Sequence, residues 1–321
     1  MASPAPRASR QQLRAQVALV VAAFLFGSTF VVTKDAIEDV TPIAYVTLRF
    51  AVGTLIMIPI AWFESRRVEA PKGMPGRGTL LRLGLLAGAA LAVGYVLQTV
   101  GLQYTSASNS AFITGLFVVF TPLLAIALRH RGLGVNTAIA VVVAVLGLFL
   151  LTGARLAIGK GDALTLGCAF AYAIHIIVLS TMTARFRPLA FNAVQLGMLT
   201  VLTAPLLLVT GVGDLTGRAV AAIVFTGAAV SALSFSLQVS GQRRLTPTRS
   251  ALLLSTEPVF AGVIGFVVGD RLGALGAVGA VLILAAIVIE IGAMPGLPAR
   301  LPVPRRADRA DVDPTVRPPG Q

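Results

Sequence analysis

The sequence predicts an all-α membrane protein with ten transmembrane helices arranged as two inverted five-helix repeats. Its composition is the first reason, because 56% of the 321 residues are hydrophobic and only 12% are charged, whereas a soluble domain carries about 25% charged residues. Apolar runs of about 20 residues, long enough to cross a ~30 Å hydrocarbon core, recur along the chain. A β-barrel would instead show ~10-residue segments of alternating polarity. The third reason is an internal repeat.

The predicted spans follow one another with short connections. We expect the first five at 16–34, 43–63, 80–101, 107–128 and 135–152, and the second five at 162–182, 190–211, 217–240, 249–268 and 274–292. The first run follows three arginines and resembles a signal peptide, but Gly27-Ser28-Thr29 interrupts it without an obvious cleavage site, so we expect it to be retained. The predicted organisation is a basic cytoplasmic N-terminus (1–15), two five-helix repeats (16–153 and 162–293) and a disordered cytoplasmic tail (294–321) rich in Pro and Arg.

The internal repeat is clearest where Ala92–Phe120 aligns with Ala232–Phe260, without a gap, at an offset of 140 residues. The shared polar and glycine positions, such as Gln98 with Gln238, raise the match above what composition alone would give. Because each half has an odd number of spans, the second half must enter the membrane from the opposite face. The halves are therefore expected to form an inverted repeat.

Positive charge is distributed unevenly between the two sides of the predicted membrane. The two ends and the even-numbered loops hold 20 of the 26 Lys and Arg residues, the odd-numbered loops hold 5, and Arg49 lies within a span. Lys and Arg favour the cytoplasmic side, so both termini are expected in the cytoplasm, with the chain in the plasma (inner) membrane. This distribution accounts for the net charge of +13 without a nucleic-acid partner.

No pattern in the chain indicates catalysis. It has no HExxH, GxSxG or paired-carboxylate cluster, and Gly159-Lys160-Gly161 lacks the rest of a phosphate-binding loop. Its one cysteine, Cys168, excludes an internal disulfide and a cysteine-based metal site. We therefore expect no enzyme activity, no metal and no cofactor, and a secondary rather than an ATP-driven mechanism. A non-transporting sensor or scaffold and a lipid-modifying enzyme are the alternatives.

Polar residues inside the spans point to a pocket, because such residues tend to face the bundle interior or a water-filled cavity. Ser231, Ser234 and Gln238 fall on one face of the eighth span. In the third span Gln98 matches Gln238, and Tyr95 matches Phe235 beside that face, so inversion would set the two Gln residues at opposite mouths of one cavity. Helix–helix hydrogen bonding, worth ~1 kcal/mol, is the competing interpretation.

Glu257-Pro258 is the sharpest local feature. Glu257 lies eight residues beyond Arg249, or ~12 Å along a helix, close to the membrane midplane, where a carboxylate costs about 2.5–3.5 kcal/mol. Pro258 removes a backbone donor and should bend the helix. A bend beside a carboxylate is typical of the discontinuous helices at transporter sites. A coupling carboxylate and a structural one both remain open, and Pro122 in the fourth span is the nearest counterpart of Pro258.

Two further polar residues lie inside spans. His175 lies deep in the sixth span. It is expected to act either as an interhelical hydrogen-bonding group or as a proton relay. Arg49 can extend towards the outer surface or pair with Asp35, Glu38 or Asp39. A structural or gating role for Arg49 is favoured over contact with substrate.

The chain resembles the EamA-type branch of the drug/metabolite transporter superfamily over about 16–293. The resemblance rests on Phe26-Gly27-Ser28, Leu48-Arg49-Phe50, Asn109–Gly115, Arg249–Leu254 and Glu257–Phe260. It implies a ten-helix basket with a central cavity lined by spans 1, 3, 4, 6, 8 and 9, with spans 5 and 10 at the periphery. Members typically export amino acids, related metabolites or drugs, and many have Trp where this chain has Phe26.

These observations together predict a secondary active transporter that exports small organic solutes by alternating access. Its expected partners are the solute and the lipid bilayer. A homodimer is also compatible with the sequence, because Gly84-x-x-x-Gly88 is typical of close helix packing, either within the bundle or between two copies of the chain. The expected substrate-binding residues are Phe26, Tyr95, Gln98, Thr114, Tyr172, His175, Ser234, Gln238 and Glu257. Arg49, Pro122 and Pro258 are expected to have gating or structural roles.

Overall fold

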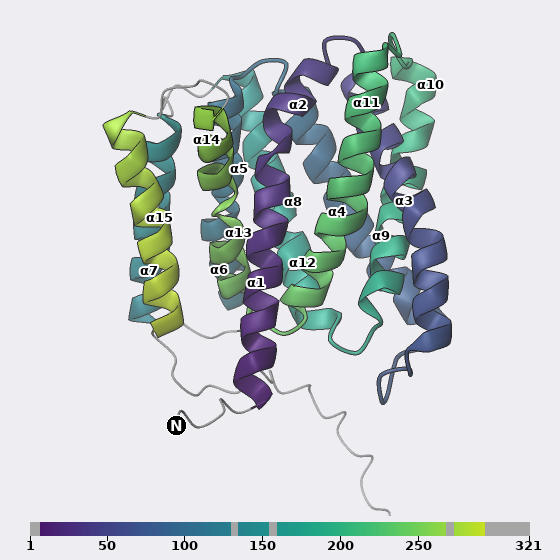
Figure 1. The fold of residues 1–321 in the computed structure, drawn as a ribbon, viewed down its shortest axis with the longest axis horizontal. Helices are drawn as coiled ribbons and strands as arrows, with labels where there is room; N and C mark the ends of the chain where they lie inside the picture. Colours follow the sequence, from purple (N-terminus) through teal and green to yellow (C-terminus); the bar gives the residue numbers. More distant parts are fainter. Residues whose placement is uncertain (1–6, 130–133, 154–158, 268–272, 293–321) are drawn as a thin grey trace, which may run out of the picture.

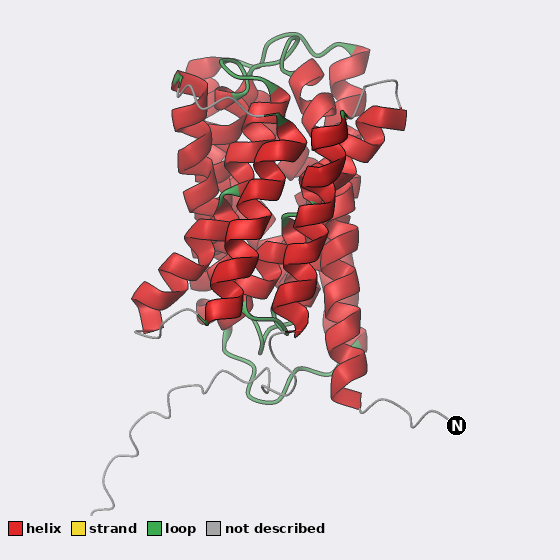
Figure 2. Cartoon of the chain, turned by 90° about the vertical axis from the view of Figure 1, so that its left-hand side faces the viewer, coloured by secondary structure: helices red, strands yellow, loops and turns green. Residues whose placement is uncertain are grey.

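The computed structural model describes residues 7–129, 134–153, 159–267 and 273–292. Within those residues the secondary structure is helical, apart from one isolated β-bridge between Val40 and Gly213. The helices run roughly side by side (Figure 1), and the loops gather at the two ends of the bundle (Figure 2). The predicted disordered tail lies outside the described residues.

The first half contains seven helices: α1 (Arg7–Gly27), α2 (Thr29–Ala36), α3 (Pro42–Arg67), α4 (Arg77–Gly101), α5 (Ala107–Gly115), α6 (Phe117–Arg129) and α7 (Val135–Thr152). The second half begins with α8 (Lys160–Met182), α9 (Pro188–Thr203), a 3-10 turn η1 (Ala204–Leu206) and α10 (Leu207–Thr210). It continues with α11 (Gly217–Phe225), a π-helix η2 (Thr226–Ser234), α12 (Phe235–Gln242), α13 (Pro247–Leu254), α14 (Glu257–Val267) and α15 (Ala274–Gly292).

Nine helical stretches among the described residues are long and apolar enough to cross a membrane, and each coincides with a predicted span. The remaining prediction, 249–268, is not one continuous helix. It consists of α13 and α14, which are separated by Ser255 and Thr256, and its last residue lies outside the described part of the chain. Pro258 has no N–H to offer to the carbonyl of Leu254, which favours an interruption at this place.

The residues aligned at an offset of 140 adopt the same local structure. Leu116 separates α5 from α6, and its N–H donates to the carbonyl of Ile113 at 3.1 Å. The equivalent N–H of Thr256 donates to the carbonyl of Leu253 at 3.3 Å, at the break between α13 and α14. Each half therefore contains one helix that is interrupted at the same point of the repeat.

The two interrupted helices run in opposite directions. In Figure 1, α5 lies above α6, whereas the later helix α14 lies above α13. Their N-terminal caps also correspond, because Ser106 accepts a hydrogen bond from the N–H of Asn109 and Thr246 accepts one from that of Arg249. The same cap and the same break thus occur in two segments of opposite direction.

Helices of one half pack mainly against helices of the other. The principal contacts are α3 with α9 and η2, α4 with α8 and α9, α1 with α12, and α7 with α15. Gly88 lies in the α4–α9 contact, and a Cβ at this position would come within 2.6 Å of the Gln195 carbonyl oxygen. The predicted small-residue packing is therefore found inside the bundle. The α7–α15 pair lies at the left edge of Figure 1, the peripheral place that the resemblance implies for spans 5 and 10.

An ionic contact joins the two halves at the end of the bundle where α2 meets α3. The guanidinium of Arg218 lies 3.1 Å from one carboxylate oxygen of Asp39, and the hydroxyl of Thr216 donates to the other at 2.6 Å. The hydrogen bond from Arg218, with that from Thr216, lowers the pKa of the Asp39 carboxyl below its ordinary value of 3.8. Asp39 is thus ionised at neutral pH.

Candidate functional site

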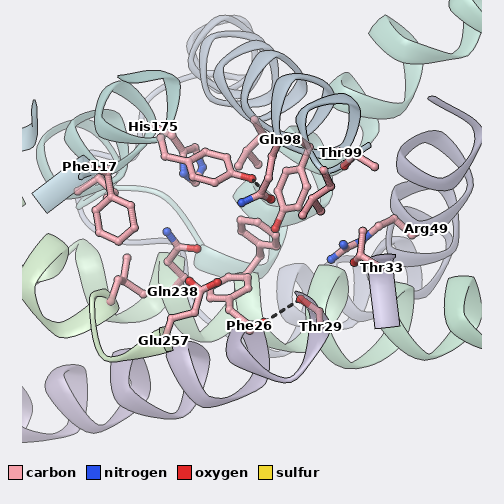
Figure 3. A pocket seen from close by; sticks show the side chains of 17 residues that line it. Phe26, Thr29, Thr33, Arg49, Gln98, Thr99, Phe117, His175, Gln238 and Glu257 are labelled. Carbon is pink, nitrogen blue, oxygen red and sulfur yellow. Dashed lines mark hydrogen bonds between the residues drawn. The ribbon is translucent and has the colours of Figure 1, made fainter. Parts of the chain in front are cut away.

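A cavity lies in the interior of the bundle, between helices of both halves (Figure 3). Its lining comes from α1, α2, α3, α4, α6, α8, α12, α13 and α14. Seven of the nine residues predicted to bind substrate line it: Phe26, Tyr95, Gln98, Tyr172, His175, Gln238 and Glu257. The lining includes every span that the resemblance implies, and it adds the second span through Arg49.

The other two predicted residues, Thr114 and Ser234, lie outside the cavity wall. The hydroxyl of Thr114 accepts a hydrogen bond from Nε2 of Gln98 at 3.0 Å, so Thr114 positions a residue of the lining. Ser234 donates to the backbone carbonyl of Ala22 in α1 at 2.9 Å. Ser234 ends the π-helix η2, and its hydroxyl is directed to the backbone of α1.

Aromatic rings make up much of the cavity wall. The rings of Phe26 and Phe235 meet edge to face with their centroids 5.1 Å apart. The ring centroids of Tyr95 and Tyr172 are 5.5 Å apart. The Tyr172 hydroxyl donates to Oε1 of Gln98 at 3.3 Å. Such side chains offer a solute a broad apolar surface together with a few hydrogen-bonding tips.

Glu257 begins α14 directly after the break in the ninth span, and its carboxylate faces the cavity. Among the described residues, the carboxylate has no hydrogen-bond or ion-pair partner. The backbone here packs closely on α1, because a Cβ on Gly27 would lie 2.5 Å from the carbonyl oxygen of Glu257. A carboxylate without a partner, held at a helix break, is therefore available to a solute or a proton.

His175 lines the cavity and also belongs to a buried hydrogen-bond network. Its Nε2 lies 3.0 Å from Oε1 of Gln195, whose amide donates to Oδ1 of Asn192 at 2.9 Å. Asn192 in turn donates to the hydroxyl of Ser236 at 2.9 Å. The network links α8 and α9 to α12, so His175 takes the interhelical position that was one of its two predicted roles.

Arg49 does not pair with the acidic residues predicted for it. Asp39 and Glu38 contact Arg218 instead, at 3.1 Å and 3.5 Å, and Arg49 is only 2% exposed. Its guanidinium lies over the rings of three aromatic residues, 5.6 Å from the centroid of Tyr45, 5.1 Å from that of Phe50 and 5.0 Å from that of Tyr95. The prediction of an outward-facing side chain is wrong because these rings hold the cation inside the bundle.

The two prolines lie at different points of their helices. Pro258 is the second residue of α14, immediately after the break. Pro122 lies inside α6, which is helical on both sides of it, whereas the break in that span is at Leu116. Only Pro258 therefore lies beside an interruption.

Three polar residues of the cavity lining were not predicted: Thr29, Thr33 and Thr99. Thr33 and the hydroxyl of Tyr45 are 3.0 Å apart, and Tyr45 donates to Thr226 at 3.1 Å. The separation of Thr29 and Thr33 by four residues places them on one helical face, and this spacing is visible in the sequence.

Comparisons with known proteins agree with this architecture. A family model described as the EamA-like transporter family matches the chain twice, over residues 13–153 and 159–291. An uncharacterized transporter from Archaeoglobus fulgidus is 28% identical over 281 residues, which cover 87% of this chain and 86% of that protein. A solved structure, titled only as the crystal structure of a protein, shares the fold with a TM-score of 0.70 at 16% identity, over 86% of this chain and 96% of that one. Because the family model covers both halves, the chain belongs to the EamA-like transporter family and is a multi-pass membrane transporter.

Proposed function

We propose that this transporter is a secondary active exporter of small organic solutes, such as amino acids, related metabolites or drugs, across the plasma membrane. The observation that carries the proposal is the interior cavity, to which helices of both halves contribute polar side chains and one carboxylate. A cavity of this kind at the centre of a bundle suits alternating access, in which one site is exposed to each side in turn.

The proposed framework is ten crossings in two inverted repeats, with both termini in the cytoplasm. The packing supports it, because exchanging each span for its counterpart in the other half leaves the principal packed pairs unchanged. Thus α1 with α12 corresponds to α8 with α4, α3 with η2 corresponds to α9 with α4, and the pairs α3–α9 and α7–α15 correspond to themselves. A pseudo-twofold axis in the membrane plane would relate the halves in this way.

The interlocked packing bears on how access would alternate. Separating one half from the other as a rigid body would break the α3–α9, α4–α8 and α7–α15 contacts at once. We therefore propose that the moving units each contain helices from both halves. The interruptions at Leu116 and at Ser255-Thr256 supply local hinges beside the cavity.

Glu257 is the proposed coupling residue. It is the carboxylate of the cavity lining, where the other titratable groups are Arg49, Tyr95, Tyr172 and His175. A carboxylate that exchanges a proton as the cavity changes sides would couple solute export to the proton gradient.

Solute flux in proteoliposomes tests the proposal, with metabolite extracts as the first substrate pool and a pH gradient imposed or collapsed. We expect the wild type to show flux that rises with the gradient, and Glu257→Gln to lose that dependence. Glu290→Gln is the matched control, because Glu290 is a buried carboxylate that accepts a hydrogen bond from Thr137 at 2.9 Å, away from the cavity. Binding without flux would favour a sensor instead, and normal gradient dependence in Glu257→Gln would remove the coupling role.

A further inference from the structure

Arg49 is a buried cation whose hydrogen-bonding capacity is largely unused. Its Nε and Nη2 atoms have no hydrogen-bond partner, although the side chain is only 2% exposed. Leaving buried charged donors unpaired is costly, which is why such groups in native proteins usually have an acceptor. Arg49 lines the cavity, so these two donors lie beside it without an acceptor among the described residues.

Three aromatic rings, those of Tyr45, Phe50 and Tyr95, surround the guanidinium of Arg49. Rings stabilise a guanidinium through its flat faces, and the three centroids lie 5.0–5.6 Å from its central carbon. The N–H bonds of a guanidinium lie in the plane of the group, so an anion binds at its edge. Two parallel N–H bonds of this kind match the two oxygens of a carboxylate.

The described residues offer no anion in contact with Arg49. The nearby acidic residues of the α2–α3 connection, Glu38 and Asp39, contact Arg218. The carboxylate within the cavity belongs to Glu257, and Figure 3 shows Arg49 and Glu257 on opposite sides of the cavity. The cavity thus presents a cation at one side and a carboxylate at the other, with aromatic rings between them.

We propose that Arg49 is the anion-binding residue of the transport site and that the solute carries a carboxylate, bound by the edge of the guanidinium. The inference rests on the proposed function, because it assigns a chemical class to the solute of the same cavity. It also changes the role of Arg49 from a structural cation to a determinant of specificity.

The test measures binding of matched acid and amide pairs to the full-length protein in lipid nanodiscs by titration calorimetry. The probes are acetate with acetamide, 3-phenylpropionate with 3-phenylpropionamide, and L-phenylalanine with L-phenylalaninamide, which differ only at the group that Arg49 would contact. We expect the wild type to bind at least one acid about tenfold or more tightly than its amide, since hydrogen bonds to charged groups are the stronger ones. Arg49→Gln should abolish this preference, and Arg49→Lys should retain part of it.

The matched control is Arg66→Gln, which removes the same charge from the same helix. Arg66 lies at the end of α3, with its guanidinium 4.1 Å from the centroid of the exposed ring of Trp62, away from the cavity. This variant should keep the acid preference of the wild type. An equal affinity for acids and amides in the wild type, an absence of binding by every acid, or an unchanged preference in Arg49→Gln would each overturn the proposal.

A second measurement does not depend on a variant that folds. Phenylglyoxal modifies arginine side chains, and mass spectrometry of the wild type reports its reaction with Arg49. The tightest acid should slow that reaction and its amide should not, and equal rates with both would contradict the proposal. Flux is a separate readout: an acid preference without flux would reject the transport proposal alone, whereas flux without an acid preference would reject the assignment of Arg49 alone.

Discussion

Two ionisable side chains without a direct counterion give this cavity its chemistry. Arg49 and Glu257 both line it, and neither forms an ion pair among the described residues. Charged groups inside membrane spans are costly and tend to mark solute or ion pathways. The amide of Gln98 is bonded to Thr114 and Tyr172, whereas Oε1 of Gln238 has no partner among the described residues. Arg49, Glu257 and Gln238 are therefore where a solute gains most from binding.

The network through His175 makes a prediction about stability. Replacing Gln195 with leucine leaves Nε2 of His175 and Oδ1 of Asn192, both in buried residues, without their present partner. Each unsatisfied group costs about 1–3 kcal/mol, so we expect Gln195→Leu to lower the midpoint of thermal unfolding in detergent. Gln103→Leu is the control, since Gln103 is exposed at the end of α4. An equal midpoint for both variants would argue against a structural network.

Seven of the nine residues expected to bind substrate line the cavity, and Arg49 shows what the sequence could not provide. Polar or aromatic residues in apolar spans, together with their repeat partners, were enough to select Gln98, Gln238, Tyr95 and Glu257. Arg49 was assigned an outward direction, because a sequence shows how far a charge lies from a span end but not which neighbours surround it. Its direction depends on rings from two helices, of which Tyr95 lies on α4, and that contact exists only in the packed bundle.

At the scale of elements, the cavity is bounded by irregular helices. The first span is divided at Ser28, the fourth at Leu116 and the ninth at Ser255-Thr256, and the eighth contains the π-helix η2. Hydropathy predicts where apolar runs lie, and so it placed the spans. It does not report on backbone hydrogen bonding within a run. Gly27-Ser28-Thr29 and Pro258 are visible signals for the interruptions of the first and ninth spans, whereas the break at Leu116 and the π-helix have none.

The close contact between α1 and the ninth span predicts that a larger residue at Gly27 destabilises the protein. A Cβ on Gly27 would lie 2.5 Å from the carbonyl oxygen of Glu257 and 3.0 Å from the backbone nitrogen of Ala261. Backbone atoms cannot rotate away, so Gly27→Ala should force α1 from the break and cost about 1–3 kcal/mol, as overpacking does. We expect a lower unfolding midpoint in detergent and reduced flux in proteoliposomes.

Gly197→Ala is the matched control for this helix contact. Gly197 lies inside α9, and its added Cβ would have Thr54 Cγ2 as its nearest neighbour at 3.5 Å, an ordinary contact distance. Alanine is also favoured over glycine inside a helix by roughly 0.5–1 kcal/mol. This variant should match or exceed the stability of the wild type. Equal stability of Gly27→Ala would show that α1 adjusts without cost.

At the scale of the whole molecule, the two halves interlock and do not stand beside each other. α3 packs on α9, and α7 packs on α15, so repeat counterparts are also neighbours. The family model likewise matches the chain twice, once in each half. A duplication whose copies cross the membrane in opposite senses would place counterparts face to face around an axis in the membrane plane. Parallel copies would require an even number of spans in each half.

Epitope tags can test this arrangement in cells. A tag inserted after Gly153, which is exposed and has a positive φ of 58° at the end of α7, follows five proposed spans, whereas a tag at the carboxyl end follows ten. We expect the two to report opposite compartments, because an odd number of crossings separates them, with the carboxyl end in the cytoplasm. A tag after Gly73 is the control: this exposed residue, with a φ of 67°, lies between α3 and α4 and should share the compartment of the carboxyl end. If the tags after Gly153 and at the carboxyl end reported the same side while the Gly73 tag behaved as expected, the halves could not be inverted copies, and the proposed alternation of access would lose its structural basis.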